Sequence, residues 1–283
     1  MKKIFLLLIS ILSYSGIYAQ NDSIYFWKNG QLLAQRSIKT ADLDSITFKR
    51  PTPPTGINIA GPNVTDIDGN TYQSVTNCGL TFTKSNLNVS KYSDGTPIPQ
   101  VQNQSQWDNL TTGAWCYYNN DPANGAVYGK LYNWYAVAGI YDAASATNPA
   151  LRKKLAPAGW HVPSDGEWSS LINCLDPNAD GGNNLPNIAG GKMKATGTIQ
   201  AGTGLWQNPN TYATNASGFT GLPAGCRDGN GPFYGVGNDG FWWSSSENFT
   251  SNAWFRNLSY NDGNAYSYYY NKRFGFSVRC VRD

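Results

Sequence analysis

The chain has 283 residues, of which 14% are charged and 14% aromatic, and it contains 30 Gly and 10 Trp. Its 21 Lys and Arg nearly balance its 18 Asp and Glu, which argues against the basic surface that nucleic-acid binding requires. Five cysteines without CxxC spacing, together with a single histidine, argue against a structural zinc site.

Residues 1–19 are predicted to be a cleavable secretory signal. Lys2 and Lys3 precede an apolar run from Ile4 to Leu12, and small residues end at Ala19. The run is shorter than the ~20 residues that a membrane span needs. No cysteine directly follows Ala19, so lipid attachment there is not expected. We expect an exported protein at the cell surface, associated with an outer membrane or secreted, with no membrane span in the mature chain.

A small β unit is predicted for residues 20–50. An Asn-Gly pair between two β-prone runs is a strong hairpin signal, and a further run adds a strand. The predicted strands are residues 23–27, 31–35 and 44–48. A proline-rich linker over residues 51–62 separates this unit from the main domain, residues 63–283.

The main domain has one clear helix start. Ser164 and Glu167 have the spacing of a capping box, apolar residues then recur at helical spacing, and Asp176-Pro177 ends the helix. A second helix is predicted over residues 129–139. Strands are predicted over residues 253–258 and 274–281, and residues 180–238 are expected to form long loops with short strands.

Near the start of the main domain, Asp66-Ile-Asp-Gly-Asn70 is predicted to form a tight turn between two short strands. Its two aspartates resemble a calcium loop, but the spacing and the distal glutamate of an EF-hand are missing.

Candidate catalytic groups are sparse. His161 is the only imidazole, no Gly-x-Ser-x-Gly elbow accompanies it, and nothing local supports a couple with Cys226. The carboxylates are scattered, and one sequence does not show whether any two of them face each other as a glycosidase requires. We expect no enzymatic activity, no catalytic residue, no metal and no cofactor.

The most unusual stretch is residues 248–274, in which 27 residues include six Asn and five Tyr. Tyrosine with Asn and Ser is what antibody loops use to bind protein surfaces. The alternative is an ordinary exposed hairpin. Trp254 and Leu258 are predicted to point inward, with Phe255, Asn257 and Ser259 outward. The predicted ligand-binding residues are Phe249, Asn252, Phe255, Asn257, Ser259, Tyr260, Asn261, Asn264, Tyr266, Tyr268 and Tyr270.

Several motifs together resemble a known family. They are Asp66–Asn70, Asn86–Asn88, Tyr128–Trp134, Leu155–Trp168, and Trp242–Glu247 leading to Gly275–Asp283. In this order they resemble the Fibrobacter succinogenes major paralogous domain. The resemblance implies an α+β fold of the C-type-lectin and formylglycine-generating-enzyme type, with small antiparallel sheets, two helices and long loops. It also implies an exported surface protein without established enzymatic activity. The Glu-Pro-Asn and Trp-Asn-Asp motifs of calcium-dependent lectins are absent.

The resemblance also implies a disulfide. C-type-lectin folds often tie a helix to the last strand, which corresponds here to Cys174 and Cys280. A bond between Cys78 and Cys116 is a weaker expectation, and Cys226 is then the odd thiol.

A second resemblance concerns residues 248–274 alone. The stretch looks like the variable region of proteins diversified by retroelements, which mutate adenines chiefly in Asn codons. Only Trp254 and Lys272 fall outside the residue set that such mutation reaches.

Three functions stay open. The chain binds a protein or glycan partner outside the cell through its Tyr- and Asn-rich surface; or it is an extracellular carbohydrate-binding module or glycan-active enzyme; or it is a structural surface or fimbrial component. No nucleic-acid partner is expected.

Overall fold

The computed structural model describes residues 23–28, 31–37 and 56–283. The chain divides into two compact units, with the boundary between Thr52 and Pro53. In the first unit, β1 (Ser23–Lys28) pairs antiparallel with β2 (Gln31–Ser37), which is the predicted hairpin. The predicted signal, the strand over residues 44–48 and most of the linker lie outside the described residues.

The second unit mixes short helices with short strands, consistent with the predicted α+β class. Its helices are α1 (Gln104–Asp108), α2 (Pro122–Tyr128), α3 (Trp134–Val137), α4 (Ala143–Thr147), α5 (Asp165–Leu175) and α6 (Ala189–Met193). Its strands are β3 (Ile59–Ala60), β4 (Val64–Thr65), β5 (Thr71–Tyr72), β6 (Ser74–Asn77), β7 (Leu80–Thr83), β8 (Trp115–Cys116), β9 (Leu131–Tyr132), β10 (Trp160–His161), β11 (Ala224–Arg227), β12 (Phe233–Val236), β13 (Asp239–Phe249), β14 (Asn252–Ser259), β15 (Ala265–Asn271) and β16 (Val281–Arg282).

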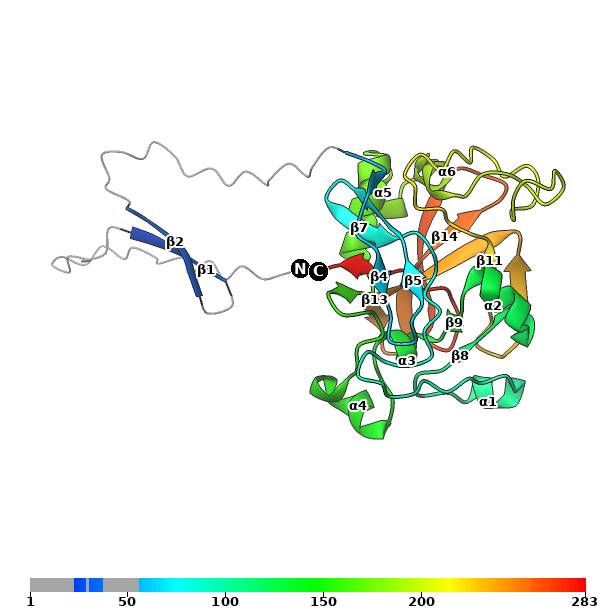
Figure 1. Ribbon diagram of the computed structural model, residues 1–283, viewed down its shortest axis with the longest axis horizontal. Helices are drawn as coiled ribbons and strands as arrows, with labels where there is room; N and C mark the ends of the chain where they lie inside the picture. The colour runs from blue at the N-terminus through cyan, green and yellow to red at the C-terminus, as the bar shows by residue number, and fades with distance from the viewer. Residues whose placement is uncertain (1–22, 29–30, 38–55) are drawn as a thin grey trace. The chain divides into compact units, whose positions relative to one another are not determined.

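Two five-stranded sheets organise this unit, in the orders β10-β16-β7-β6-β3 and β12-β11-β13-β14-β15. In Figure 1, α5 and α6 lie at one end of the unit and α1, α3 and α4 at the other. The second sheet departs from the antiparallel expectation, because β11 and β13 run parallel with Gly225 beside Gly240. Edge strand β15 continues the hairpin that β13 and β14 begin, so the Tyr- and Asn-rich stretch forms one margin of this sheet.

Helix α5 begins where the sequence predicts. The Ser164 side chain accepts a hydrogen bond from the backbone of Glu167, and Glu167 accepts one from the backbone of Ser164, so two otherwise unpaired N–H groups are satisfied. The prediction of two helices is too few: the described residues form six α-helices, of which only α5 exceeds two turns. In the predicted helix over residues 129–139, the first part is strand β9, and α3 covers only four residues.

The middle of the second sheet, in β13 and β14, is buried on both of its faces. Trp243 and Phe255 pack into a cluster with Phe276, whereas Trp242 and Leu258 pack on the other face against residues of α5. The predicted strand over residues 274–281 is mostly wrong. This segment runs through the core and makes single bridges to three different strands, so only its end pairs regularly, as β16.

Buried cations hold the long loops in place. Lys194 donates to the carbonyl oxygens of Thr211, Ser259 and Asp262, at 2.9, 2.7 and 2.7 Å. Arg279 similarly donates to the carbonyls of Thr83, Phe219 and Thr220. Both side chains are fully buried. Buried backbone carbonyls need hydrogen-bond donors. These cations supply donors to the loop carbonyls, as neighbouring strands do in a sheet.

The predicted Cys174–Cys280 disulfide is wrong. Cys174, at the end of α5, bonds to Cys78 in the turn between β6 and β7. Since β7 pairs with β16, the helix is tied to the neighbour of the last strand rather than to that strand. The weaker Cys78–Cys116 expectation fails with it. Cys116, Cys226 and Cys280 are all buried free thiols, not Cys226 alone.

The predicted turn at Asp66–Asn70 is confirmed. One Asp66 oxygen accepts hydrogen bonds from the backbone of Asp68 and Asn70, and the other accepts from the side chains of Asn70 and Tyr72. The carboxylate therefore closes the turn between β4 and β5. In the part of the chain that the structure describes, no helix combines the length and the apolar character needed to cross a membrane.

Candidate functional site

The β14–β15 hairpin carries a row of aromatic side chains on one face. Strand register places Phe255 opposite Tyr268 and Asn257 opposite Tyr266, so their side chains share a face. Tyr268 and Tyr270 are 48% and 51% exposed there. We call this group of side chains the tyrosine face; it consists of Phe241, Phe255, Tyr266, Tyr268, Tyr270 and Phe274, with Phe255 buried beneath the tyrosines.

The rings of the tyrosine face stack on one another. Tyr266 and Tyr268 are nearly parallel, with centroids 5.5 Å apart, and Tyr270 lies 5.7 Å from Phe255 and 4.5 Å from Phe274. Each such pair contributes about 0.5–1.5 kcal/mol beyond the buried area. Stacking therefore covers part of the ring faces, while Tyr268 and Tyr270 stay about half exposed. The Tyr266 hydroxyl is bonded to Asp262 and Asn264.

Two residues predicted to bind ligand do not reach the surface. Phe255 is 1% exposed and packs under Tyr268 and Tyr270, and Asn257 is 9% exposed and donates to the backbone carbonyl of Gly240. The prediction that both point outward is wrong, because core residues such as Trp243 and Phe276 cover this end of the face. The prediction for Leu258 is confirmed, whereas Trp254 is only half-buried.

The remaining predicted residues separate along the hairpin. Phe249 and Asn252 lie near the β13–β14 turn, whereas Ser259, Tyr260, Asn261 and Asn264 surround the β14–β15 turn. Asn252 and Ser259 are the two ends of β14, seven residue steps apart, which is a length of about 23 Å. The side chain of Asn264 is held by its neighbours. Its Oδ1 accepts from the backbone N–H of Asn187, and its Nδ2 donates to the Tyr266 hydroxyl. These residues do not form one compact site.

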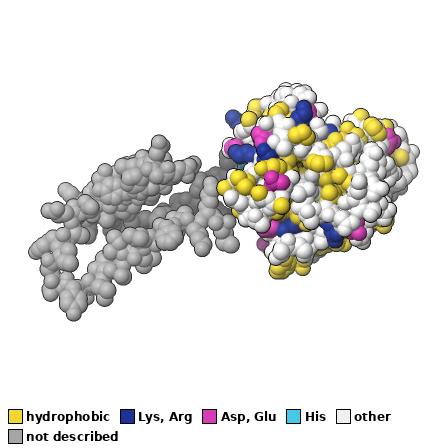
Figure 2. Space-filling view, turned by 90° about the horizontal axis from the view of Figure 1, so that it is seen from below, with side chains coloured by type: hydrophobic (Ala, Val, Ile, Leu, Met, Phe, Trp, Pro, Cys, Tyr) yellow, Lys and Arg dark blue, Asp and Glu magenta, His cyan; other side chains and the backbone are white. Residues whose placement is uncertain are grey.

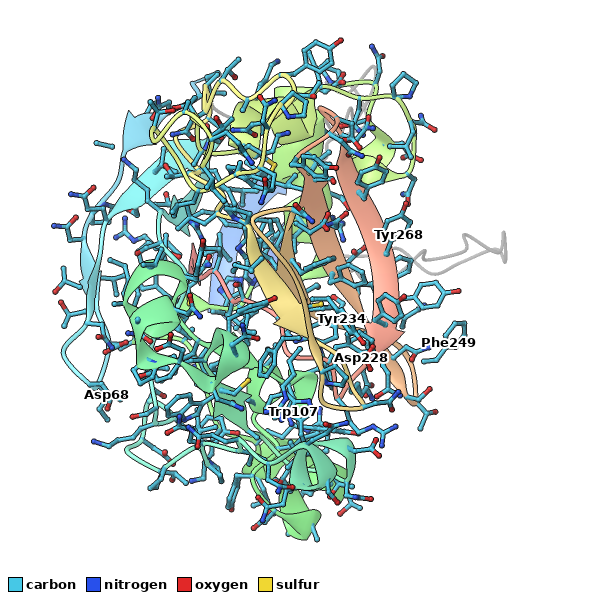
Figure 3. All side chains as sticks on the ribbon, turned by 90° about the vertical axis from the view of Figure 1, so that its right-hand side faces the viewer. Asp68, Trp107, Asp228, Tyr234, Phe249 and Tyr268 are labelled. Atoms are coloured by element: carbon cyan, nitrogen blue, oxygen red, sulfur yellow. A yellow bond between two sulfur atoms is a disulfide. The ribbon has the colours of Figure 1, made fainter. Side chains whose placement is uncertain are left out.

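Phe249 belongs to the opposite side of β15. It is 62% exposed and packs edge-on against Tyr269, which also contacts Trp254. Because neighbouring strand residues point to opposite faces, Tyr269 lies across the sheet from Tyr268 and Tyr270. In Figure 3, Phe249 and Tyr268 both lie at the outer margin of the sheet. The edge strand therefore exposes tyrosines on both of its faces.

Sequence reasoning missed the supporting members of this surface. Phe274 stacks on Tyr270, and Phe241 packs at a tilt against Phe255. Tyr234 is also 55% exposed, but it lies on β12 at the opposite edge of the sheet. Phe274 falls within the Tyr- and Asn-rich stretch, but it can stack on Tyr270 only because the chain turns after β15. No sequence pattern links Tyr234 or Phe241 to the hairpin; only the strand order of the sheet does.

His161 joins the chain end to α5. Its Nδ1 lies 2.6 Å from an Asp283 oxygen and its Nε2 lies 2.9 Å from a Glu167 oxygen. The hydrogen bond with Glu167, opposed by burial, and the bond with Asp283 raise the pKa of His161. Both ring nitrogens thus face carboxylates, and neither is available as a base toward a nucleophile. Burial also raises the pKa of Cys226 to about 12, which disfavours its thiolate.

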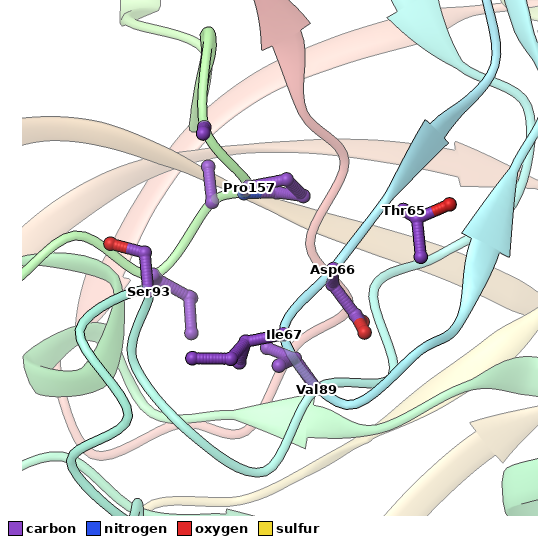
Figure 4. Close-up of a pocket in the computed structure, with 9 residues that line it drawn as sticks. Thr65, Asp66, Ile67, Val89, Ser93 and Pro157 are labelled. Carbon is purple, nitrogen blue, oxygen red and sulfur yellow. The ribbon is translucent and has the colours of Figure 1, made fainter.

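A further hollow is mostly apolar. It has a volume of about 210 Å³ and is lined by Thr65, Ile67, Ser93 and Pro157, and the Asp66 carboxylate points away from it (Figure 4). Among the described residues, no group of three or more His, Cys, Asp or Glu is placed to hold a metal ion. On the face shown in Figure 2, apolar and uncharged polar side chains predominate over charged ones.

The chain was compared with known proteins. A family model described as the Fibrobacter succinogenes major domain matches residues 75–282. No curated protein and no solved structure matches the chain. The matched residues contain α5, both sheets except β3, and the whole tyrosine face. The chain belongs to the Fibrobacter succinogenes major domain family.

Proposed function

We propose that the chain is an exported binding or adhesion protein that contacts a protein partner through the tyrosine face. The observation that carries this proposal is the row of stacked rings in which Tyr268 and Tyr270 are about half exposed. Rigid tyrosines provide apolar contact area and hydrogen bonds at a low cost in conformational entropy. Tyrosine is also among the residues that most often dominate the binding energy of protein interfaces.

The stacking favours a protein over a glycan at this face. A sugar binds an aromatic side chain by lying on the flat face of the ring, and stacking on neighbouring rings covers part of these faces. The exposed part of Tyr268 and Tyr270 includes ring atoms beside a hydroxyl group. Such a surface suits the backbone amides and irregular side chains of a polypeptide.

Export is supported by two independent features. The order of charged, apolar and small residues over 1–19 is that of a secretory signal. The Cys78–Cys174 disulfide is a bond that persists in oxidising compartments. Both features support the proposal that the tyrosine face meets molecules outside the cytoplasm.

Selection from a random peptide library tests the site. The purified protein serves as bait, and a variant with Tyr268→Ser and Tyr270→Ser serves as the comparison. We expect enriched peptides to bind the variant at least tenfold more weakly. Both tyrosines are about half exposed, so the double variant should lose no more than about 2 kcal/mol of stability.

Tyr141→Ser is the matched control, because Tyr141 is also exposed and lies in the loop between α3 and α4, away from the hairpin in sequence and fold. Peptides should bind this control like the wild type. The proposal fails if no peptide is enriched, or if the enriched peptides bind the double variant as well as they bind the wild type. Thermal melts show whether a loss of binding comes from unfolding.

We further propose that the coding stretch for residues 248–274 is diversified, and burial sharpens which codons vary. Arg256 and Lys272 are buried, and they bond to Asp165 and to the carbonyl of Thr250. The test is to sequence the neighbouring DNA for an adenine-rich near-copy beside a reverse-transcriptase gene. That copy should differ at the codons of exposed residues such as Phe249, Tyr268 and Tyr270, and agree at those of Arg256 and Lys272. The absence of a near-copy contradicts diversification.

A further inference from the structure

A hollow of about 510 Å³ opens at the β14–β15 turn, at the far end of the hairpin from Phe249. Its lining comes from four separate segments: the end of α5, the loop before α6, the loop at Tyr212, and the turn itself. The volume lies within the range usual for small-molecule sites. Sequence reasoning assigned nothing to three of these four segments, and only Asn264 is shared with the residues predicted there to bind ligand.

The walls of the hollow are fixed by hydrogen bonds. Asp176 accepts from the backbone of Ile188 at 2.9 Å, which joins the end of α5 to the loop before α6. Asn264 accepts from the backbone of Asn187 at 2.7 Å, which joins that loop to the turn. Behind the turn, buried Lys194 holds the carbonyls of Thr211, Ser259 and Asp262. The hollow is therefore preorganised, which lowers the entropic cost of binding.

Tyr212 supplies an open aromatic ring. It is 75% exposed, and it forms no stacked or edge-on pair with another aromatic ring among the described residues. One side of the ring lies over Gly263, where an added Cβ would come within 2.9 Å of Cδ2. Its backbone has a φ of +59°, a conformation costly for a bulky residue. A large apolar side chain is thus held in water on a strained backbone.

The polar groups that line the hollow include both acceptors and donors. The carboxylates of Asp176 and Asp262 each accept hydrogen bonds from this chain and retain unused lone pairs. Asn178 is exposed, and no hydrogen bond of its side-chain amide is found among the described residues. None of the described lining residues is Lys or Arg. Two carboxylates without a lining cation disfavour an anionic ligand, whereas acceptors beside an amide donor match the hydroxyl groups of a sugar.

We propose that this hollow binds a sugar unit of a neutral glycan without a metal ion. The apolar face of the sugar ring stacks on Tyr212, and its hydroxyls bond to Asp176, Asp262 and Asn178. This site is separate from the tyrosine face and does not depend on the proposed protein partner. The two differ in the state of their rings, since Tyr266, Tyr268 and Tyr270 stack on other rings and Tyr212 does not.

The test is titration of the purified protein with neutral tetrasaccharides of glucose, xylose, mannose and N-acetylglucosamine, in the presence of EDTA, observed by calorimetry and by NMR. At least one tetrasaccharide should bind. Tyr212→Asn should weaken its binding at least tenfold, whereas Tyr212→Phe should keep it within about threefold, because the ring face remains. Asparagine tolerates a positive φ, so the Asn variant should melt no lower than the wild type.

The variant with Tyr268→Ser and Tyr270→Ser is the second control and should bind the sugar like the wild type. The proposal is overturned if no tetrasaccharide binds, if Tyr212→Asn binds as well as the wild type, or if EDTA abolishes binding. It is also overturned if tetramethylammonium binds in the hollow and the sugars do not, because a cation then explains the carboxylates better. Failure here leaves the peptide selection on the tyrosine face unaffected.

Discussion

The tyrosine face and the Tyr212 hollow use the same residue type in opposite ways. On the hairpin, the rings stack at 4.5–5.7 Å, so part of each flat face is covered. At the hollow, Tyr212 is 75% exposed, pairs with no other aromatic ring among the described residues, and has Gly263 against one side of its ring. A stacked row suits the uneven surface of a protein, whereas an isolated ring suits the flat side of a sugar. Ring environment, more than tyrosine content, therefore indicates the class of ligand.

The largest expected effect comes from Lys194→Met, because Lys194 connects the two regions. Its ammonium donates to Thr211, next to Tyr212, and to Ser259 and Asp262 in the hairpin. Methionine fills the space but leaves three carbonyls without donors, at about 1–3 kcal/mol each, offset by relief of the buried charge. Burial lowers the pKa of Lys194 to about 8, in the direction that a cost of burying this charge requires. We expect a net loss of about 3 kcal/mol in urea unfolding, together with loss of sugar binding.

Lys192→Met is the matched comparison, since Lys192 lies on α6 two residues before Lys194, and among the described residues its ammonium donates to a single carbonyl, that of Leu175. It should cost about 1 kcal/mol, the usual value for one hydrogen bond. If both variants lose the same free energy, Lys194 does not organise the junction between the two regions.

A smaller effect is expected from Tyr266→Phe, which removes one hydroxyl and tests whether the two regions bind independently. That hydroxyl donates to the Asp262 carboxylate at 2.8 Å and accepts from Asn264 at 3.1 Å. The ring, and with it the stack on Tyr268, is retained. We expect about 1 kcal/mol of destabilisation. Sugar binding should weaken severalfold because Asp262 loses its orientation, while peptide binding at the tyrosine face stays the same. Equal weakening of both ligands would show that the two surfaces form one site.

The smallest effect concerns His161, which lies outside both regions and serves as a reference for stability alone. Its raised pKa means that its contribution is full below about pH 6.5 and is lost as the pH rises through the folded-state value. Although burial opposes it, hydrogen bonds from His161 and Ser164 lower the pKa of Glu167 to about 2, so that contribution is lost as the pH falls below about 4.5.

His161→Gln should therefore destabilise the protein most between about pH 4.5 and 6.5. The loss stays below about 1 kcal/mol because solvent screens this partly exposed cluster. Melting temperatures of the variant and the wild type across pH 3–9 check the expectation. A difference that does not change with pH would exclude the ionic origin, and a change in ligand binding would contradict the placement of His161 outside both regions.

The local elements were predictable from sequence where a short pattern decides them. The Ser164–Glu167 capping box starts α5, and β14 follows the predicted strand closely. The stretch that carries the tyrosine face was also found by composition, with Tyr268 and Tyr270 exposed as expected. The direction of Phe255 was wrong, because alternation gives two faces to a strand and does not tell which of them, or whether both, the rest of the chain will cover.

Sequence alone thus determined the family motifs, the one long helix and the Tyr- and Asn-rich hairpin, because each depends on residues close together along the chain. Tertiary structure decided the rest. The partner of Cys174, the stacking that occupies the hairpin rings, and the hollow beside Tyr212 all depend on segments from distant parts of the chain. Buried Lys194 and Arg279 bring several of these segments together by donating hydrogen bonds to their backbone carbonyls. Every residue type has a backbone carbonyl, so the sequence does not show which residues accept these bonds.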